Sequence, residues 1–205
     1  QWRAQQGTQS ADEHDPWGCG LIGQEWSAIT TTLGDLEAKR TACHLAWSVQ
    51  YLRWFDELSL QPGDPVAIYA SSSFPGLLLS AISAAEARQL DLLLVVSLSA
   101  SNWGANHPDL PWPVIASELR RAGFIRKQAA FYTLGGESEI GGGLAPEGEA
   151  LLRSAAESAG VELIMADNLD EMIERKSVLL QEHGARLLIS IGGSQANMGD
   201  ALEIL

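Results

Sequence analysis

Residues 92–98 read Leu-Leu-Leu-Val-Val-Ser-Leu, an apolar run without a charged side chain. Seven residues are too few to cross a membrane as a helix, but they match the length of a strand. Because polar and apolar residues do not alternate in it, the run indicates a strand that is buried on both faces. Such strands belong to parallel sheets whose two faces are covered by crossover helices. The run therefore predicts a central strand in an α/β domain.

The same order of strand, polar loop and helix recurs along the chain. Strands are predicted at 66–70, 92–98, 128–134, 161–166 and 186–191. Helices are predicted at 36–58, 77–88, 114–122 and 169–183, with one more that begins at Pro146. In the first of these, one apolar stripe comprises Leu45, Val49, Leu52 and Phe55 or Trp54. Because such alternation implies right-handed crossovers, we expect a mostly parallel, doubly wound, Rossmann-like sheet of about five strands with helices on both faces.

No repeat or linker divides the 205 residues, so residues 1–205 are predicted to form one domain, with a polar N-terminal segment and lead-in loop at 1–35. The sequence does not begin with Met, and Leu205 falls about two turns into the helix expected after Gly192. We therefore expect further sequence at both ends.

Charge narrows the classes of partner. The formal net charge is −13, which opposes the approach of phosphate backbones and of anionic lipid surfaces. We therefore expect no nucleic-acid partner. Basic pairs occur at 39–40, 120–121, 126–127 and 175–176, and all but the first are interpreted as solvated helix faces.

Polar residues follow the predicted strands and should meet at one edge of the sheet, where α/β proteins bind ligands. The candidate ligand-binding residues in these loops are Ser71, Ser72, Ser73, Gly76, Ser101, Asn102, Trp103, Gly192, Gly193, Ser194 and Asn197, and the glycine-rich loop 135–143 joins them. The set is rich in hydroxyls, amides and accessible backbone, and poor in charge. It suits a carboxylate, phosphate or peptide-like ligand. Ser73 and Ser194 also suit helix caps that need no ligand.

The segment before the first helix is dense in polar residues. One interpretation places Thr31 and Thr32 beside the ligand and makes Lys39 and Arg40 cationic contacts for an anion, with Arg40 able to grip a carboxylate through two nitrogens. The other interpretation is an ordered lead-in loop and helix cap.

The sequence contains no motif that defines a catalytic mechanism. The G-x-S-x-G elbow of serine hydrolases is absent, and the candidate base His107 could assist Ser72, although a histidine beside a proline in a polar loop is more often a surface residue. Nucleotide-binding glycine motifs are also missing, so we expect no cofactor. Cys19 and Cys43 leave a disulfide and two free thiols open, and neither they nor the acidic cluster 12–15 supports a metal site.

Five segments carry a resemblance: GLIGQEWSAITTTLGDLEAKRTA, SSSFPG, SASNWGANHPD, GGGLAPEG and IGGSQANMG. In this order they resemble the poly-gamma-glutamate system protein family, over most of the chain. Members of that family accompany the bacterial machinery that makes and exports poly-gamma-glutamate, and they carry an N-terminal membrane anchor before an extracytoplasmic domain. The resemblance implies an extracytoplasmic location in the cell envelope and membrane contact only through an anchor outside this sequence. It brings no catalytic residue set, and Cys19, Cys43 and His107 are not expected to be required by the family's pattern.

We expect an accessory protein of poly-gamma-glutamate synthesis or export that binds a gamma-glutamyl ligand or a synthase component. One alternative is an amide hydrolase or transferase whose nucleophile is a serine among 71–73. Another is a structural subunit of a cell-surface assembly that forms homo-oligomers through its apolar helix faces.

Overall fold

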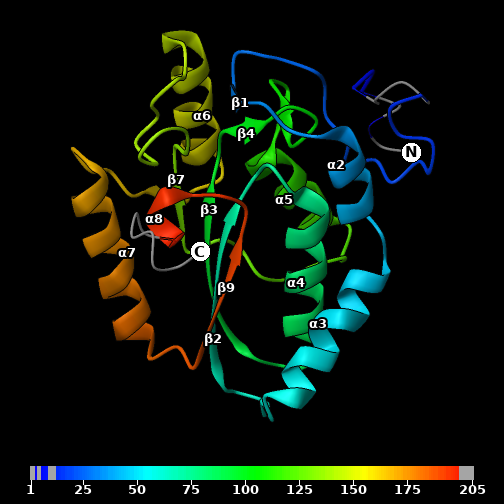
Figure 1. The fold of residues 1–205 in the computed structure, drawn as a ribbon, viewed down its shortest axis with the longest axis vertical. Helices are drawn as coiled ribbons and strands as arrows, with labels where there is room; N and C mark the ends of the chain where they lie inside the picture. The colour runs from blue at the N-terminus through cyan, green and yellow to red at the C-terminus, as the bar shows by residue number, and fades with distance from the viewer. Residues whose placement is uncertain (1–2, 4–5, 9–12, 199–205) are drawn as a thin grey trace.

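A five-stranded, all-parallel sheet with the order β8-β7-β3-β2-β9 forms the centre of the molecule (Figure 1). The computed structural model describes residue 3, residues 6–8 and residues 13–198. The strands of the sheet are β2 (Pro65–Ser71), β3 (Asp91–Ser97), β7 (Phe131–Thr133), β8 (Glu162–Leu163) and β9 (Leu187–Ile191). The expected α/β, Rossmann-like parallel sheet of about five strands is confirmed.

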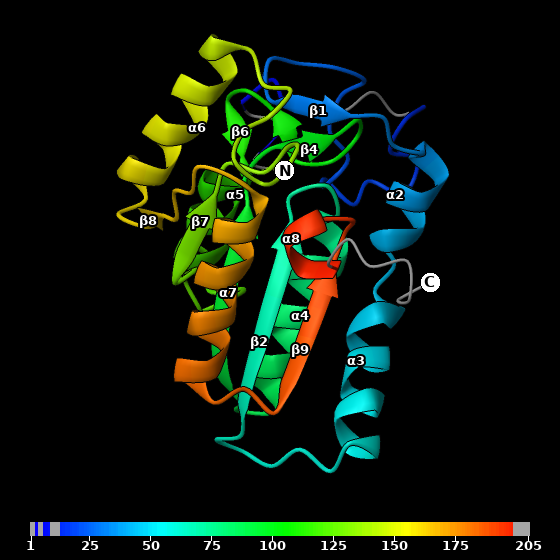
Figure 2. The ribbon, with the colours of Figure 1, turned by 60° about the vertical axis from the view of Figure 1, so that its left-hand side comes forward.

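Helices cover both faces of this sheet. The long helices are α3 (Ala46–Glu57), α4 (Pro75–Ala87), α5 (Trp112–Arg121), α6 (Pro146–Ser158) and α7 (Leu169–His183). The connections from β2 through β3 and β7 to β8 all step in one direction along the sheet, whereas α7 leads back across it to β9. Right-handed crossovers then require α7 to lie on the face opposite α4, and Figure 2 shows α7 in front of the strands and α4 behind them.

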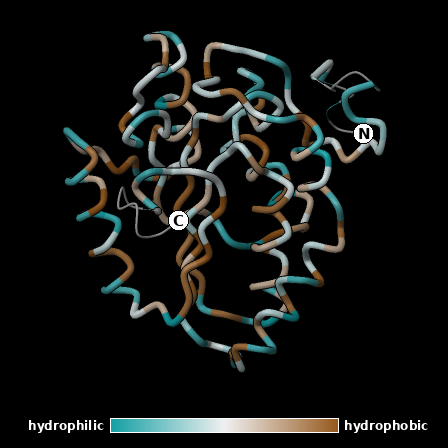
Figure 3. Tube along the Cα trace, viewed as in Figure 1, coloured by the Kyte–Doolittle hydropathy of each residue, from teal (hydrophilic) through white to brown (hydrophobic). Residues whose placement is uncertain are grey.

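Side chains on the two faces of the sheet pack into two separate apolar cores. In β2, Val66 and Ile68 pack into the larger core on the α4 side, whereas Ala67 and Tyr69 pack into the smaller core beneath α7. This alternation follows from the two-residue period of a strand. Because β2 and β3 are apolar toward both cores, the trace through the middle of the sheet is hydrophobic (Figure 3).

The register brings three strand ends to one level. β2 pairs with β3 from Pro65–Asp91 to Ser71–Ser97, and with β9 from Val66–Leu187 to Ala70–Ile191. The loops that follow these three strands therefore begin side by side at the carboxyl edge of the sheet.

The single helix expected at 36–58 was wrong, because α2 (Leu36–Ala42) ends before α3 begins. The break is a tertiary effect: the start of α4 lies so close to the end of α2 that a Cβ on Gly76 would lie 2.5 Å from the Ala42 carbonyl oxygen. The Thr41 carbonyl at the break accepts both the backbone N–H of His44 at 3.1 Å and the indole N–H of Trp47 at 3.0 Å.

The apolar stripe expected in this helix was also wrong in part. Leu45 and Val49 are 85% and 55% exposed, whereas Tyr51 and Phe55 are the α3 side chains buried in the core. Two strands are shorter than expected, since only Phe131–Thr133 and Glu162–Leu163 pair in the regions 128–134 and 161–166. Both lie on the side of the sheet that ends at β8.

Short elements complete the carboxyl edge. They are β1 (Thr30–Thr32), which pairs in parallel with β4 (Ala100–Ser101), the antiparallel pair β5 (Asn106–His107) and β6 (Leu110–Pro111), and α8 (Gln195–Met198). α8 begins the helix expected after Gly192, while its continuation to Leu205 and the acidic residue Asp12 lie outside the described residues. None of the described helices has the length and apolar content needed to cross a bilayer.

Candidate functional site

A cleft of about 720 Å³ opens at the carboxyl edge of the sheet. The loops after β2, β3, β7 and β9 line it together with β1 and α2. Of the residues expected to bind a ligand, those on its wall are Thr31, Thr32, Lys39, Ser71, Ser73, Ser101, Gly193 and Ser194. Several segments that are far apart in the sequence therefore meet at this cleft, as the sequence predicted.

Other expected residues face elsewhere. Arg40 is held by the N-terminal segment, because its Nε donates to the His14 carbonyl at 3.0 Å and its guanidinium also contacts Glu37. The Asn102 side chain accepts the Gly34 N–H at 2.8 Å, and the ring of Trp103 lies 4.6 Å from that of His14.

The remaining expected residues support the backbone around the cleft. Gly76 provides the close contact between α4 and α2, and Gly192 has a φ of +96° with Ser71 Cβ only 2.8 Å from the place of an added Cβ. The Asn197 side chain accepts a hydrogen bond from Lys176 and donates to the Tyr69 carbonyl at 3.4 Å.

Ser72 and His107, the catalytic candidates, are not brought together. Ser72 is fully buried and its hydroxyl donates to the Ser97 carbonyl at 2.6 Å. The His107 Nδ1 accepts the backbone N–H of Asp109 at 3.2 Å, and burial lowers the pKa of its imidazole, an effect opposed by Asp109. Neither residue lines the cleft.

Lys39 is the most unusual residue of the cleft, because this ammonium group is buried among neutral partners. The residue is 3% exposed, and its Nζ donates to the Ser73 carbonyl and to the Ser101 hydroxyl, each at 2.7 Å. It also lies 3.6 Å from the centroid of the Phe74 ring. Within the part of the chain that the structure describes, no carboxylate forms an ion pair with it. Burial lowers the pKa of Lys39 to about 8, although the charge of Asp35 opposes the shift.

Ser101 is fixed from two sides. Its backbone N–H donates to the Ser73 hydroxyl oxygen at 2.9 Å, and Ser73 in turn accepts the Ser71 hydroxyl at 2.9 Å. On the other side Gly34 approaches so closely that an added Cβ would lie 2.9 Å from Ser101 Oγ and 3.1 Å from Lys39 Cε. The contact between Ser101 and Lys39 therefore sits in a rigid frame.

Asn106 explains much of the polar character of the lead-in loop. Its fully buried side chain accepts the Gln24 N–H at 2.9 Å, and donates to the Gln24 carbonyl at 2.7 Å and to Thr30 Oγ1 at 2.9 Å. These bonds fasten the segment before β1 to the loop after β3. The contacts of Asn106 match the interpretation of this segment as an ordered lead-in loop, and the ligand contact at Thr31, Thr32 and Lys39 stays a prediction for residues that line the cleft.

A buried ion pair forms another part of the site, which sequence reasoning missed. The carboxylate of Glu139, in the glycine-rich loop, accepts Lys176 Nζ at 2.8 and 2.9 Å and the Ser194 hydroxyl at 2.6 Å. Thr133 donates to the same carboxylate at 3.0 Å, and Ser97 is a further donor. The composition of the loops predicted a cleft that is poor in charge. That prediction was wrong, because the Glu139 carboxylate lies on the wall of the cleft.

The expectation that Lys176 lies on a solvated helix face was wrong, since its side chain is 3% exposed. A signal for its burial exists in the sequence: Lys176 is four residues after the buried Met172 and precedes Leu179 and Leu180, so it falls on the apolar face of α7. Glu139 carries no comparable signal, because its φ of +63° and its direction depend on the fold of its loop.

Desolvation by itself raises the pKa of Glu139, but the charge of Lys176 and the hydrogen bonds from Lys176, Ser194 and Ser97 outweigh it and hold the pKa below its usual value. Glu139 is therefore an anion at neutral pH. Both of its oxygens accept hydrogen bonds from other segments, so the carboxylate ties these loops together.

The alternative role of Ser73 and Ser194 as helix caps does not match their contacts. The N-cap of α4 is Phe74, without a side-chain hydrogen bond, and the Ser194 hydroxyl is given to Glu139. The hydroxyls of both serines therefore contact other loops of the cleft: Ser194 donates to Glu139, and the Ser73 oxygen accepts the Ser101 N–H.

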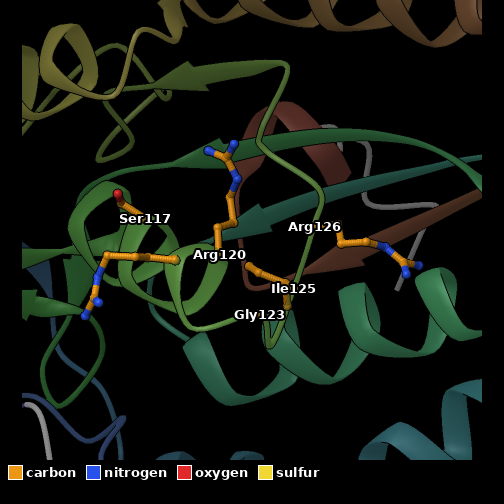
Figure 4. A pocket seen from close by; sticks show the side chains of 6 residues that line it. Ser117, Arg120, Gly123, Ile125 and Arg126 are labelled. Carbon is orange, nitrogen blue, oxygen red and sulfur yellow. The ribbon is translucent and has the colours of Figure 1, made fainter.

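A second hollow of about 510 Å³ lies at the end of α5, lined by Ser117, Arg120, Arg121, Gly123, Ile125 and Arg126 (Figure 4). Arg121 pairs with Glu118 at 2.6 Å and Arg126 with Glu86 at 3.6 Å. In Figure 4 the guanidinium groups of Arg120 and Arg126 point away from each other, so they do not converge on one ligand. Among the described residues, no group of three or more His, Cys, Asp or Glu side chains is placed to hold a metal ion.

Comparisons with known proteins give little further information. No protein-family model matches the sequence, and no curated protein matches it. Among solved structures, the chain is similar to the one described as "Crystal structure of CurK enoyl reductase", with 13% identity over 71% of this chain and 48% of that chain, and a TM-score of 0.21. The chain thus spans about half the length of that structure, and a likeness at this level carries no argument about function.

Proposed function

We propose that the protein is an extracytoplasmic accessory protein of poly-gamma-glutamate synthesis or export, and that its cleft binds the carboxylate-bearing end of a gamma-glutamyl chain. The observation that supports a carboxylate ligand is the buried ammonium group of Lys39, whose partners in the cleft are neutral. The biological context comes from the sequence resemblance described above.

A buried cation without a counterion is costly, because desolvation is not repaid by an opposite charge. An incoming carboxylate at Lys39 would supply that charge and gain a charge-assisted hydrogen bond. The Ser73 hydroxyl oxygen accepts hydrogen bonds from Ser71 and Ser101, which leaves its proton for donation to a ligand, and the backbone at Gly193 on the cleft wall offers a further neutral hydrogen bond. The volume of about 720 Å³ lies within the usual range for sites that bind small molecules.

The overall charge of −13 favours a short ligand or a chain end. A long polyanion brings many charges near an acidic surface and is repelled, whereas a chain end brings few. The same argument leaves open a synthase component as the partner that presents the chain end.

Isothermal titration calorimetry with short gamma-glutamyl oligomers at pH 7 tests this proposal. We expect the wild-type protein to bind and Lys39→Met to lose at least about tenfold in affinity, which corresponds to about 1.4 kcal/mol. Lys127→Met is the matched control, because Lys127 lies beside Asp91 at the opposite edge of the sheet and is absent from the wall of the cleft. No heat with wild type at millimolar ligand, or equal binding by Lys39→Met, would rule the proposal out.

A further inference from the structure

We propose that Ser101 and Lys39 form a catalytic dyad, in which Ser101 Oγ attacks an amide carbonyl and Lys39 Nζ acts as the general base. The inference extends the proposed function from binding to reaction. It assigns the nucleophile to Ser101 rather than to the serines at 71–73.

The geometry singles out Ser101 among the serines near the cleft. Ser71 donates its hydroxyl to Ser73, Ser72 to a carbonyl, and Ser97 and Ser194 to Glu139, while Ser99 lies 3.3 Å from the Thr31 hydroxyl. The Ser73 hydroxyl oxygen accepts from the Ser71 hydroxyl and the Ser101 N–H, neither of which is a base. Ser101 differs because its oxygen lies 2.7 Å from an amine nitrogen. Both members of this contact line the cleft, so a substrate that enters would meet them.

A lysine acts as a base only when it is neutral. Burial lowers the pKa of Lys39 to about 8, which makes the neutral form accessible near physiological pH. The charged groups that line the cleft with Lys39 are Asp35, at the start of its own helix, and Glu137 and Glu139 in the glycine-rich loop, and of these Asp35 acts on the pKa of Lys39. Phe74 and the Ser73 carbonyl complete its surroundings without a negative charge in contact.

In neutral Lys39 the hydrogen bond reverses, so that the Ser101 hydroxyl donates to Nζ. As Oγ forms a bond to the carbonyl carbon, Nζ takes the hydroxyl proton and the carbonyl electron pair moves to oxygen. Collapse of this intermediate restores the C=O bond and breaks the C–N bond. The Lys39 ammonium gives its proton to the departing nitrogen, which leaves as an amine. Water then attacks the acyl-serine ester, with its proton passing through Nζ back to Ser101 Oγ, and a carboxylic acid is released.

The substrate class rests on the proposed function: an amide of a gamma-glutamyl unit. Hydrolysis creates a new carboxylate at the carbon next to Ser101, so the carboxylate that pairs with charged Lys39 in the binding proposal corresponds to the product. The two roles have opposite pH dependence. Carboxylate binding needs the ammonium form and is strongest below pH 8, whereas attack needs the amine and becomes faster above it.

Labelling with a fluorophosphonate, whose fluoride is displaced by an activated serine, tests the dyad without a natural substrate. Peptide mass spectrometry should find the label on Ser101, and the labelling rate should rise with pH with a midpoint near 8. Ser101→Ala should abolish the label, and Lys39→Met should slow it by at least about 100-fold. Ser154→Ala is the matched serine control, since Ser154 is exposed on α6.

Lys39→Arg guards against a trivial loss of folding, because it keeps a long cationic side chain that cannot serve as a base at these pH values. A folded Lys39→Arg protein that labels at the wild-type rate, label on another serine, or no label on wild type would each overturn the dyad. Binding of gamma-glutamyl oligomers without labelling removes the dyad and leaves the binding proposal intact. Labelling at Ser101 without oligomer binding keeps the dyad and removes the gamma-glutamyl ligand.

Discussion

Glu139 and Lys176 form a buried ion pair at 2.8 Å, with side chains that are 2% and 3% exposed. The pair connects the glycine-rich loop after β7 to α7, and the Ser194 hydroxyl adds the loop after β9 to the same carboxylate. Three segments that are distant in sequence are thereby tied together beside the cleft, whose wall includes Glu139 and Ser194. The shape of the site depends on this pair even though its charges cancel.

The first prediction concerns the stability that the pair provides. Glu139→Gln leaves the Lys176 ammonium buried without its counterion, so we expect a loss of about 3–5 kcal/mol in the free energy of unfolding. Glu139→Gln with Lys176→Met should lose less than the sum of the two single changes, because neither charge is then stranded. Urea unfolding of the four proteins measures the coupling, and additive losses would contradict it.

The second prediction is an acid-dependent loss of stability. The pKa of Glu139 is held below its usual value of 4.5 in the folded protein, so the contribution of its charge is complete above about pH 4.5 and is lost as pH falls through the folded pKa. Glu139→Gln should remove this part of the pH dependence. Denaturant melts at pH 3–6 test it, and parallel curves for the two proteins would show that Glu139 contributes nothing to it.

The sheet could be predicted from the sequence because the patterns that indicate its strands are local. The uncharged run at 92–98 and the repeated strand–helix alternation are properties of neighbouring residues, and the parallel pairing of β2 with β3 follows from them. Because the carboxyl ends of parallel strands lie at one edge of a sheet, the serine and glycine loops that follow them lie close together. This part of the site needed no knowledge of side-chain contacts.

The parts that sequence reasoning missed are decided by tertiary contacts. Nothing within 36–58 is a helix breaker, and the break between α2 and α3 arises where α4 packs against Ala42. Lys39 and Arg40 are adjacent and chemically alike, yet one lines the cleft and the other bonds to the His14 carbonyl. The direction of each depends on what packs around α2, which no pattern within the helix specifies.

The third prediction is the pH dependence of ligand binding. A bound carboxylate favours the ammonium form of Lys39, so protons are taken up on binding once pH exceeds the pKa of about 8 in the free protein. Affinity should be flat from pH 6 to 8 and then fall by up to about tenfold per pH unit. Calorimetry in buffers of different ionisation enthalpy measures the proton uptake, and unchanged affinity at pH 9.5 would exclude Lys39 as the cationic contact.

The fourth prediction is that Gly34→Ala disturbs the Ser101–Lys39 contact. The new methyl group would lie 2.9 Å from Ser101 Oγ, so Ser101 must move away from residue 34. We expect the free energy of unfolding to fall by about 1–3 kcal/mol. Fluorophosphonate labelling of Ser101 should slow. In the Ser101→Ala background the oxygen is absent, and the same change should destabilise the protein less. Equal destabilisation in both backgrounds would place the strain elsewhere, for instance at the Asn102 carbonyl, which lies 3.0 Å from the added methyl group.

The fifth prediction concerns Cys19 and Cys43, which are free thiols in the structure. A hydrogen bond from the Cys43 thiol lowers the pKa of Cys19, and the same contact, with burial, raises that of Cys43. The two sulfur atoms are therefore neighbours, and they join the N-terminal segment to the end of α2, where Arg40 makes a second connection to that segment. In the oxidising compartment of the proposed function we expect them to form a disulfide.

Oxidised glutathione supplies the oxidant for a test and is reduced to two thiols for each disulfide that forms. Both protein thiols should disappear from a thiol titration without formation of a covalent dimer. Closing the loop from residue 19 to residue 43 should raise the free energy of unfolding by about 3 kcal/mol. Cys19→Ser with Cys43→Ser provides the control, since its stability should not respond to the oxidant. Two thiols that remain titratable after prolonged exposure would show that the sulfur atoms do not reach bonding geometry, so that Arg40 and not a disulfide connects α2 to the N-terminal segment.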